Sequence, residues 1–282
     1  EEAKIADLAV FSFIQVVAEL NRNRQFVEYR EHPALLARLP NFRVSLGFGL
    51  HLGWSIEGAI GSEFKIDASY LSPHVNIATL LSAATDEYGV TILMSEPLVR
   101  SCNPAFTRNF RPIDHLKLSG SNTPIRIFTV DLNAEALAVE GRVADARRKN
   151  MPRDTERRER EEGKRQILED TYQVCHVFDT DRAVGRMRQC FALRFLQEFE
   201  KGYLNYEAGE WDVAEQVFRR TISIRPWIGL DQDDPVPNAT SSTSALLPDE
   251  TDGPSKTLLE YMAGFGSKAP QDWKGWRELG VR

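Results

Sequence analysis

The chain of 282 residues has few cysteines and no long apolar run. Its three cysteines are odd in number and lack CxxC spacing, so we expect neither a disulfide framework nor a zinc site, and free thiols suit a reducing compartment. The longest apolar stretch, residues 8–20, is interrupted by polar side chains and is too short for a bilayer span. The sequence therefore predicts no membrane span.

Charge and hydrophobic content narrow the possible classes further. The formal net charge of −6 argues against broad binding to nucleic acid or to an anionic bilayer. Hydrophobic residues make up 42% of the chain and charged residues 27%, which suffices for a core, and the length allows about two domains. We predict a cytoplasmic protein, with the cytosolic part of a membrane protein and a subunit of a cytoskeletal assembly as alternatives.

Helix and strand patterns alternate in the N-terminal half. An apolar stripe predicts a largely buried helix at residues 3–22, and a second helix at 74–88 ends at Gly89. Strands are predicted at residues 42–52, 54–60, 64–71, 90–94 and 125–130, and a short helix at 96–101. Gly61-Ser62 predicts a tight hairpin turn. We therefore predict an α/β or α+β layer for this half.

Three glycines lie on one face of the first predicted strand. Gly47, Gly49 and Gly53 alternate with apolar residues, and glycine weakens a strand unless a backbone or ligand approaches closely. The pattern indicates such an approach, and a bulged or bent strand is equally compatible with it.

Five short sequences follow one another between residues 44 and 95: GLHLG at 49–53, GAIG at 58–61, KID at 65–67, VNIA at 75–78 and ILMS at 92–95. In this order they resemble the second half of the class III adenylate/guanylate cyclase homology domain. RPID at 111–114 and PIRIF at 124–128 resemble the closing strands of that family. The resemblance covers roughly residues 5–131. It implies an α+β fold with a ferredoxin-like cyclase-type sheet and packed helices over residues 1–131, without its first strands.

In that family, the ribose 3′-oxygen attacks the α-phosphate with two metal ions held by two carboxylates. The resemblance places these carboxylates upstream of the predicted helix at 3–22, so their presence upstream and their loss both stay open. We predict no cofactor in this chain, and Mg²⁺ or Mn²⁺ only if the full-length protein or a partner completes the site. His51 and His74 lack further ligands at metal spacing, so we expect no metal there.

The resemblance also assigns residues around the nucleotide. Asn76 occupies the ribose-orienting position, whereas Leu80 replaces an arginine that offsets charge on the phosphate. Ser119 replaces a lysine that binds the triphosphate, and Ser69 stands where a base-selecting side chain is usual. For Asp67, beside the base-recognition strand, we expect a buried structural role. The nucleotide site is therefore predicted to be degenerate.

The C-terminal half changes composition after Glu140. We predict a charged linker or helix at 132–185, a helical hairpin at 186–226, a flexible loop at 227–251 and a helical tail at 252–282. The spacing of Gly202, Tyr206 and Trp211 resembles one tetratricopeptide repeat, with an ordinary hairpin as the alternative. One repeat cannot bury its own apolar faces, so it must pack on its surroundings.

This arrangement resembles cyclase-like proteins of unicellular eukaryotes and leads to three hypotheses. The first is a catalytically degenerate cyclase-like domain that regulates or dimerises in intracellular cyclic-nucleotide signalling, with an identical or different cyclase-type domain as partner. The second is a structural subunit that docks into a large assembly through its tail. The third is an active cyclase, a phosphorus-oxygen lyase acting on ATP or GTP. The expected interface residues are Gly47, Gly49, Gly53, Trp211, Trp273 and Trp276.

Overall fold

The chain forms two compact units, each built from several segments. The computed structural model describes residues 2–30, 32–39, 46–118, 121, 123–139, 152–168, 173–189, 191–223 and 252–279. One unit comprises Glu1–Leu46, Ser101–Asn109 and Leu132–Arg188, and the other comprises Gly47–Arg100, Phe110–Asp131 and Gln189–Arg282. The domain boundaries that we expect from the sequence are placed where its motifs begin and end, and they stay a prediction. The loop predicted at 227–251 lies outside the described residues.

The first unit is helical in its described part. Its elements are α1 (Glu2–Arg22), α2 (Arg24–Arg30), α3 (Pro33–Leu36), α6 (Pro104–Thr107), η1 (Ala134–Ala136), α8 (Arg153–Leu168), η2 (Val174–His176), α9 (Val177–Thr180) and α10 (Arg182–Arg188). The helix predicted at 3–22 is confirmed as α1, whose Val10 and Ile14 are fully buried. In the predicted linker, α8 is a charged helix with an exposed ion pair between Arg157 and Glu161.

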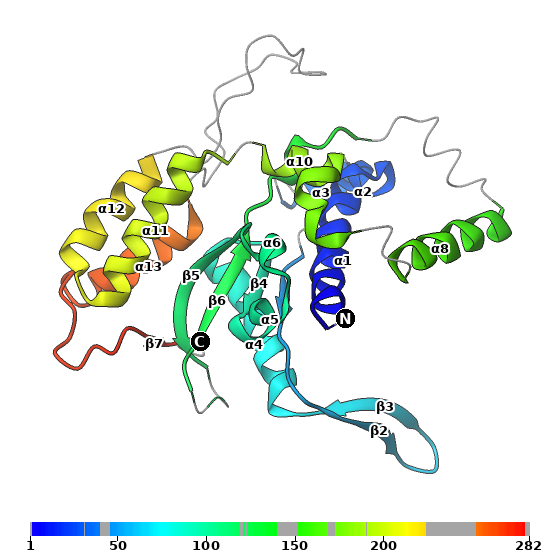
Figure 1. Ribbon diagram of the computed structural model, residues 1–282, viewed down its shortest axis with the longest axis horizontal. Helices are drawn as coiled ribbons and strands as arrows, with labels where there is room; N and C mark the ends of the chain where they lie inside the picture. Colours follow the sequence, from blue (N-terminus) through cyan, green and yellow to red (C-terminus); the bar gives the residue numbers. More distant parts are fainter. Residues whose placement is uncertain are drawn as a thin grey trace, which may run out of the picture. The chain divides into compact units, whose positions relative to one another are not determined.

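The second unit contains a five-stranded mixed sheet (Figure 1). In spatial order its strands are β1 (Phe48–Leu50), β4 (Ile92–Ser95), β6 (Ile125–Val130), β5 (Phe110–Lys117) and β7 (Arg277–Glu278). The two outer pairs are parallel and the two inner pairs antiparallel. This mixed sheet with packed helices confirms the predicted α+β class. Of the strand predicted at 42–52, residues 42–45 lie outside the described residues.

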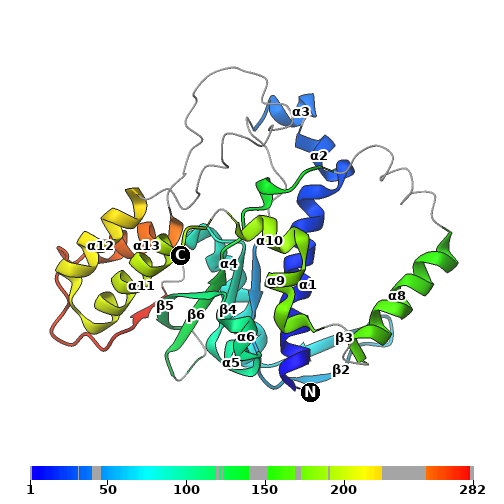
Figure 2. The ribbon, with the colours of Figure 1, turned by 45° about the horizontal axis from the view of Figure 1, so that its top comes forward.

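Helices from both halves of the sequence cover this sheet and share one core with it. They are α4 (Pro73–Tyr88), α11 (Leu193–Ala208), α12 (Trp211–Ser223) and α13 (Gly253–Ala263), and the short helix α5 (Glu96–Ser101) directly follows β4. Figure 2 shows α11 and α13 beside β5, which both helices contact. Leu81 of α4, Ile127 of β6, Phe199 of α11 and Leu258 of α13 belong to one buried cluster.

The helical hairpin α11–α12 therefore buries its apolar faces against the sheet and the tail, as expected. Gly202 sits where the two helices approach, because a Cβ there would overlap the ring of Phe218. The assignment to the tetratricopeptide type stays a prediction. The tail is not purely helical, since Arg277–Glu278 adds strand β7 to the sheet edge.

A separate two-stranded hairpin leaves this unit ahead of α4. Strands β2 (Ile56–Gly61) and β3 (Ile66–Leu71) pair antiparallel, with Gly61 opposite Ile66. The hairpin predicted at this place is confirmed, and its turn closes with a bond from the N–H of Ser62 to the carbonyl of Lys65 (2.8 Å). Figure 1 shows that the hairpin extends away from the five-stranded sheet.

Candidate functional site

Helix α4 begins and ends at strong capping residues. The Oγ of Ser72 accepts a hydrogen bond from the backbone N–H of His74 (3.1 Å), and Pro73 fills the first turn, where an N–H has no helical partner. Gly89 ends the helix with φ of 60°, in the left-handed region that favours glycine. Ser72 Oγ also donates to the carbonyl of Trp54 (2.6 Å). The cap thus fixes the start of α4 to the chain that leads into β2.

The three glycines before the hairpin face the chain's own α4. A Cβ at Gly49 would overlap the backbone of Ala78 and Ser82, and one at Gly47 would overlap Thr85. A Cβ at Gly53 would overlap the ring of His74. The close approach indicated by the sequence is therefore made by this helix. The packing of α4 accounts for the three glycines without the interface that we expected there, because α4 covers the side on which a Cβ would lie.

Asn76 and Leu80 lie one turn apart on α4 and so share a helix face. Asn76 is exposed, whereas Leu80 is half-buried and packs against the core cluster. Position 80 thus presents aliphatic carbon and offers no hydrogen-bond donor. Ser119, the third substituted position, lies outside the described residues.

Asp67 and Ser69 lie on the preceding hairpin. In the register of the strands, Ser69 faces Gly58 and Asp67 faces Ile60, so both side chains lie on one face of the ribbon. The side chain of Asp67 is 61% exposed and pairs with Lys65 Nζ at 2.9 Å. The buried role expected for Asp67 is therefore wrong, because the ribbon has no core beneath it. Among the described residues, no hydrogen bond joins this pair to Asn76.

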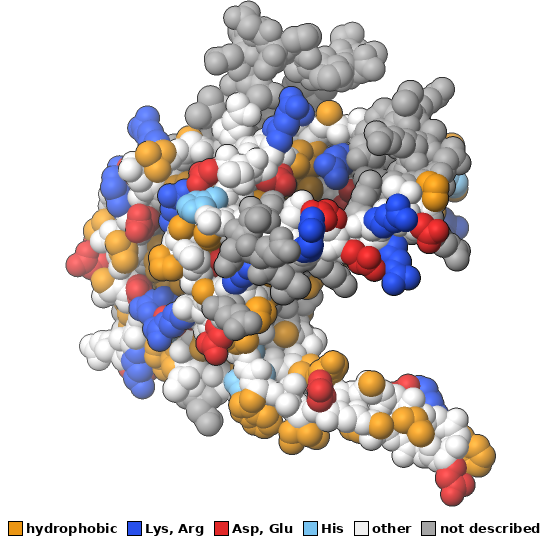
Figure 3. Space-filling view, turned by 45° about the vertical axis from the view of Figure 1, so that its right-hand side comes forward, with side chains coloured by type: hydrophobic (Ala, Val, Ile, Leu, Met, Phe, Trp, Pro, Cys, Tyr) orange, Lys and Arg blue, Asp and Glu red, His pale blue; other side chains and the backbone are white. Residues whose placement is uncertain are grey.

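Large apolar side chains are exposed along both faces of this hairpin. Ile56, Leu71 and Ile60 share one face, and Tyr70 and Ile66 share the other. Their exposed fractions range from 56% to 73%, and Phe64 in the turn is 95% exposed. Figure 3 shows hydrophobic side chains along the projecting ribbon. We call these residues the apolar hairpin surface: Ile56, Ile60, Phe64, Ile66, Tyr70 and Leu71.

Two histidines meet at the base of the hairpin. His51 Nε2 lies 2.7 Å from His74 Nδ1, and His51 Nδ1 lies 2.7 Å from Ser95 Oγ. The ring planes are 22° from parallel, and their centroids are 5.0 Å apart. Burial, and secondarily the charge on His74, lowers the pKa of His51 to about 4. No group of three or more His, Cys, Asp or Glu side chains able to hold a metal occurs in the described part of the chain.

Trp211 on α12 and Trp273 in the tail have internal partners. Trp211 is 1% exposed, so it belongs to the core and the interface role expected for it is wrong. Trp273 packs edge-on against Trp211 with centroids 4.9 Å apart and donates from Nε1 to the carbonyl of Glu207 (3.2 Å). Trp276 is half-buried and lies beside Lys117 and Lys274. Trp273 thus docks on other residues of this unit, as expected for the tail. An interface role for Trp273 and Trp276 stays a prediction.

Two buried arginines tie the C-terminal segments to the sheet, and sequence reasoning missed both. Arg111 on β5 pairs with Asp131 (2.6 Å) and with Asp252 ahead of α13 (2.9 Å). Arg277 binds Asp114 (2.8 Å) and the hydroxyl of Tyr88 (2.7 Å). Charged residues on a strand gave no local signal for this pairing.

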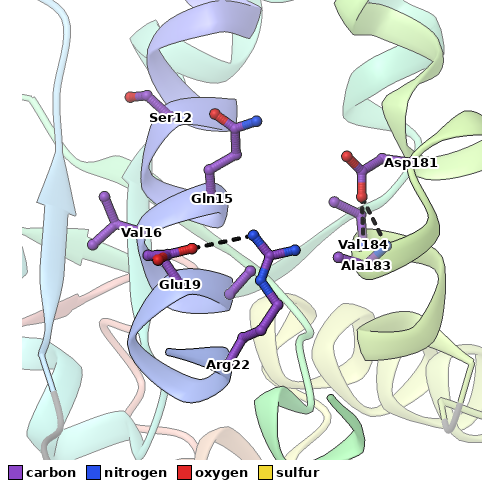
Figure 4. Close-up of a pocket in the computed structure, with 9 residues that line it drawn as sticks. Ser12, Gln15, Val16, Glu19, Arg22, Asp181, Ala183 and Val184 are labelled. Atoms are coloured by element: carbon purple, nitrogen blue, oxygen red, sulfur yellow. Dashed lines mark hydrogen bonds and ion pairs between the residues drawn. The ribbon is translucent and has the colours of Figure 1, made fainter. Parts of the chain in front are cut away.

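A concave pocket of about 360 Å³ lies in the first unit, along α1 and Asp181–Val184 (Figure 4). Two of its polar side chains, Asp181 and Glu19, accept hydrogen bonds from nearby residues of the chain. Asp181 Oδ1 caps α10 by accepting from the N–H groups of Ala183 (2.8 Å) and Val184 (3.0 Å). Glu19 accepts from Arg22 at 3.1 Å. None of the residues predicted for the nucleotide site lines this pocket, so the candidate site stays with α4 and the hairpin.

Comparison with known proteins finds adenylate cyclases among the proteins similar to this chain. An adenylate cyclase of Anabaena cylindrica is 33% identical over 89 residues, which are 31% of this chain and 18% of that protein. Adenylate cyclase 1 of Rhizobium meliloti (strain 1021) is 30% identical over 92 residues, 33% of this chain and 13% of that protein. About a third of the chain is thus similar to adenylate cyclases. The chain spans less than a fifth of the length of these relatives.

Among solved structures, a bacterial light-regulated adenylyl cyclase is 27% identical, with a TM-score of 0.26 over 30% of this chain and 23% of that chain. No family model matches the chain. The described helices include none that is both long enough and apolar enough to cross a bilayer.

Proposed function

We propose that this chain is an association module of intracellular cyclic-nucleotide signalling, built on a cyclase-like domain without turnover of its own. The observation that carries the proposal is the apolar hairpin surface. An isolated two-stranded ribbon is marginally stable in water, and this one exposes apolar side chains on both faces. Such a surface favours burial against another protein surface.

A second copy of this chain is the partner that we propose for the hairpin. Trp211 on α12 and Trp273 in the tail are already engaged within the unit, whereas the large side chains of the hairpin are mostly exposed. The resemblance to class III cyclases, whose sites form between two such domains, supports a cyclase-type partner. The hairpin then serves association, and the tail stabilises the domain that carries it.

The absence of turnover is proposed from position 80. The arginine expected there by resemblance acts on charge that develops at the phosphate, and such donors contribute roughly 10²-fold or more in rate. Leu80 offers no donor and packs on the core. Asn76 remains exposed on the same face, so its amide can still form a hydrogen bond with the ribose of a nucleotide. The phosphate, in contrast, has no cationic side chain at position 80.

Sedimentation velocity of the full chain tests the association. We expect dimers in the wild type and monomers when Phe64 and Ile66 are both changed to Ser. The matched control is Leu204→Ser, which removes an apolar side chain of 55% exposure on α11 and leaves the dimer intact. Dimers that persist in the hairpin variant, or a wild type that stays monomeric, contradict the proposal.

A further inference from the structure

The imidazole rings of His51 and His74 meet at the base of the hairpin, and their contact tolerates one added proton but not two. We propose that the contact between His51 and His74 is a pH-sensitive anchor, which holds the hairpin when the pair is neutral or singly protonated and releases it when both rings are protonated. This inference rests on the proposed association through the hairpin, and it names how that association is regulated.

Both ends of the hairpin converge on His74. The ring of Trp54, two residues before β2, lies edge-on to His74 with centroids 5.8 Å apart. Ser72 directly follows β3, and its Oγ joins the N–H of His74 to the carbonyl of Trp54. Gly53 lies against the same ring, because a Cβ there would overlap it. A displacement of His74 therefore disturbs both ends of the hairpin, before β2 and after β3.

The hydrogen bond between the rings sets the number of protons that the pair tolerates. At 2.7 Å between Nε2 and Nδ1, one hydrogen lies between the two nitrogens, so one ring donates and the other accepts. A single added proton keeps this arrangement, because an imidazolium can donate to a neutral ring. A second proton puts an N–H on both facing nitrogens and places two positive charges side by side. The bond is then lost.

The surroundings of the pair offer no compensation for a second charge. The hairpin carries Glu57, Glu63 and Asp67, and Asp67 is paired with Lys65. Helix α5 begins at Glu96, next to Ser95, and Glu96 is paired with Arg100 (2.7 Å). The acidic residues of α4 lie at its far end, while its positive N-terminal end lies beside the pair. In the described part of the chain, no carboxylate pairs with either ring.

The sign of the effect follows from His51. Its folded-state pKa of about 4 lies below the ordinary value of 6.5, so the folded arrangement disfavours protonation. The contact between His51 and His74 therefore stabilises the hairpin fully above about pH 6.5. This stabilisation is lost as the pH falls from about 6.5 to about 4. We therefore expect the hairpin to loosen in mild acid while the five-stranded sheet stays folded.

Hydrogen exchange of the full chain, expressed as protection factors between about pH 7 and pH 4, tests this anchor, together with NMR of the histidine ring nitrogens. In the wild type we expect protection of residues 56–71 to fall roughly tenfold more than protection of β6, at the pH where the second ring takes its proton. His74→Asn keeps a polar atom near the Nδ1 position without the charge, and its hairpin protection should vary little with pH. His32→Asn, outside this region, should behave as the wild type does.

Hairpin protection that falls equally in the wild type and in His74→Asn overturns the proposal. If His74→Asn does not fold, the wild-type titration still decides, because an unchanged hairpin with both rings protonated contradicts the anchor. Sedimentation at about pH 7 reports the association separately, so failure of the anchor and failure of the proposed function are distinguishable.

Discussion

Arg277 in the short strand β7 donates through Nε to the carboxylate of Asp114 on β5 at 2.8 Å, although 163 residues separate them. Asp114 is fully buried and also accepts from the hydroxyl of Tyr88 on α4 at 2.6 Å. Burial, together with the charge of Asp114, raises the pKa of Tyr88, so this hydroxyl keeps its proton and donates. The C-terminal tail is thereby locked to the sheet and to α4.

Replacing Arg277 with Met should therefore destabilise the second unit strongly. Removing one partner of a buried ion pair leaves an uncompensated charge, which typically lowers the free energy of unfolding by about 3–5 kcal/mol. Chemical denaturation measures the loss. Arg219→Met is the control, because Arg219 is 70% exposed and pairs with Glu215 along its own helix surface, where such pairs contribute less than about 1 kcal/mol. Equal losses in the two variants would contradict the role given to Arg277.

Gly49→Ala should destabilise the packing of α4 on β1. The added Cβ would overlap backbone atoms of α4, which cannot move aside as a side chain end can, and overpacking of this kind costs about 1–3 kcal/mol. Gly58→Ala on β2 is the matched control, since nothing lies within 4 Å of a Cβ there. Thermal unfolding should show a lower Tm for the first variant and an unchanged one for the second. Similar Tm values would argue against the close approach of α4.

Cys102 should resist alkylation in the folded protein. Its burial, and secondarily the negative charge of Asp7, raises the pKa of the thiol to about 12, so the nucleophilic thiolate is scarce at neutral pH. Cys175 is half-buried and should react with iodoacetamide before Cys102 does, as followed by mass spectrometry. Cys102 should react only after denaturation. Prompt labelling of Cys102 in the native protein would contradict the packing of α1 around it.

Leu80→Arg alone should not produce cyclic AMP or cyclic GMP from ATP or GTP with Mg²⁺ or Mn²⁺. By resemblance, Ser119 still replaces a lysine at the triphosphate. Circular dichroism should show that the variant is folded, because Leu80 is only half-buried. A large gain in product from this one change would show that the other substitutions matter little.

Local patterns predicted the elements whose causes are local. The helix at 74–88 has a cap at Ser72 and a terminating glycine at position 89, and the strand at 125–130 is continuous and rich in β-branched residues. The hairpin is predicted from the turn at Gly61-Ser62 between the strand patterns at 54–60 and 64–71. These features depend on neighbours a few residues apart, so the sequence displays them directly.

The features that sequence reasoning missed depend on distant partners. On β5, Arg111 and Asp114 interrupt the apolar pattern, and their partners Asp252 and Arg277 are more than 140 residues away. Strand β7 has two residues, too few for any periodicity. The contact between His51 and His74 spans 23 residues, and it was considered only as a metal pair. The resemblance located α4 and the hairpin correctly but supplied no account of how exposed the hairpin is.

The central claim is that the apolar hairpin surface is buried against a second copy of this chain. Carbene footprinting of the full chain from about 0.1 μM to about 100 μM, a range that spans weak to moderate affinities, tests it most directly. We predict that labelling of Phe64, Ile66 and Tyr70 falls as the concentration rises, while labelling of Leu204 on α11 stays constant. Hairpin labelling that is the same at every concentration would contradict the claim.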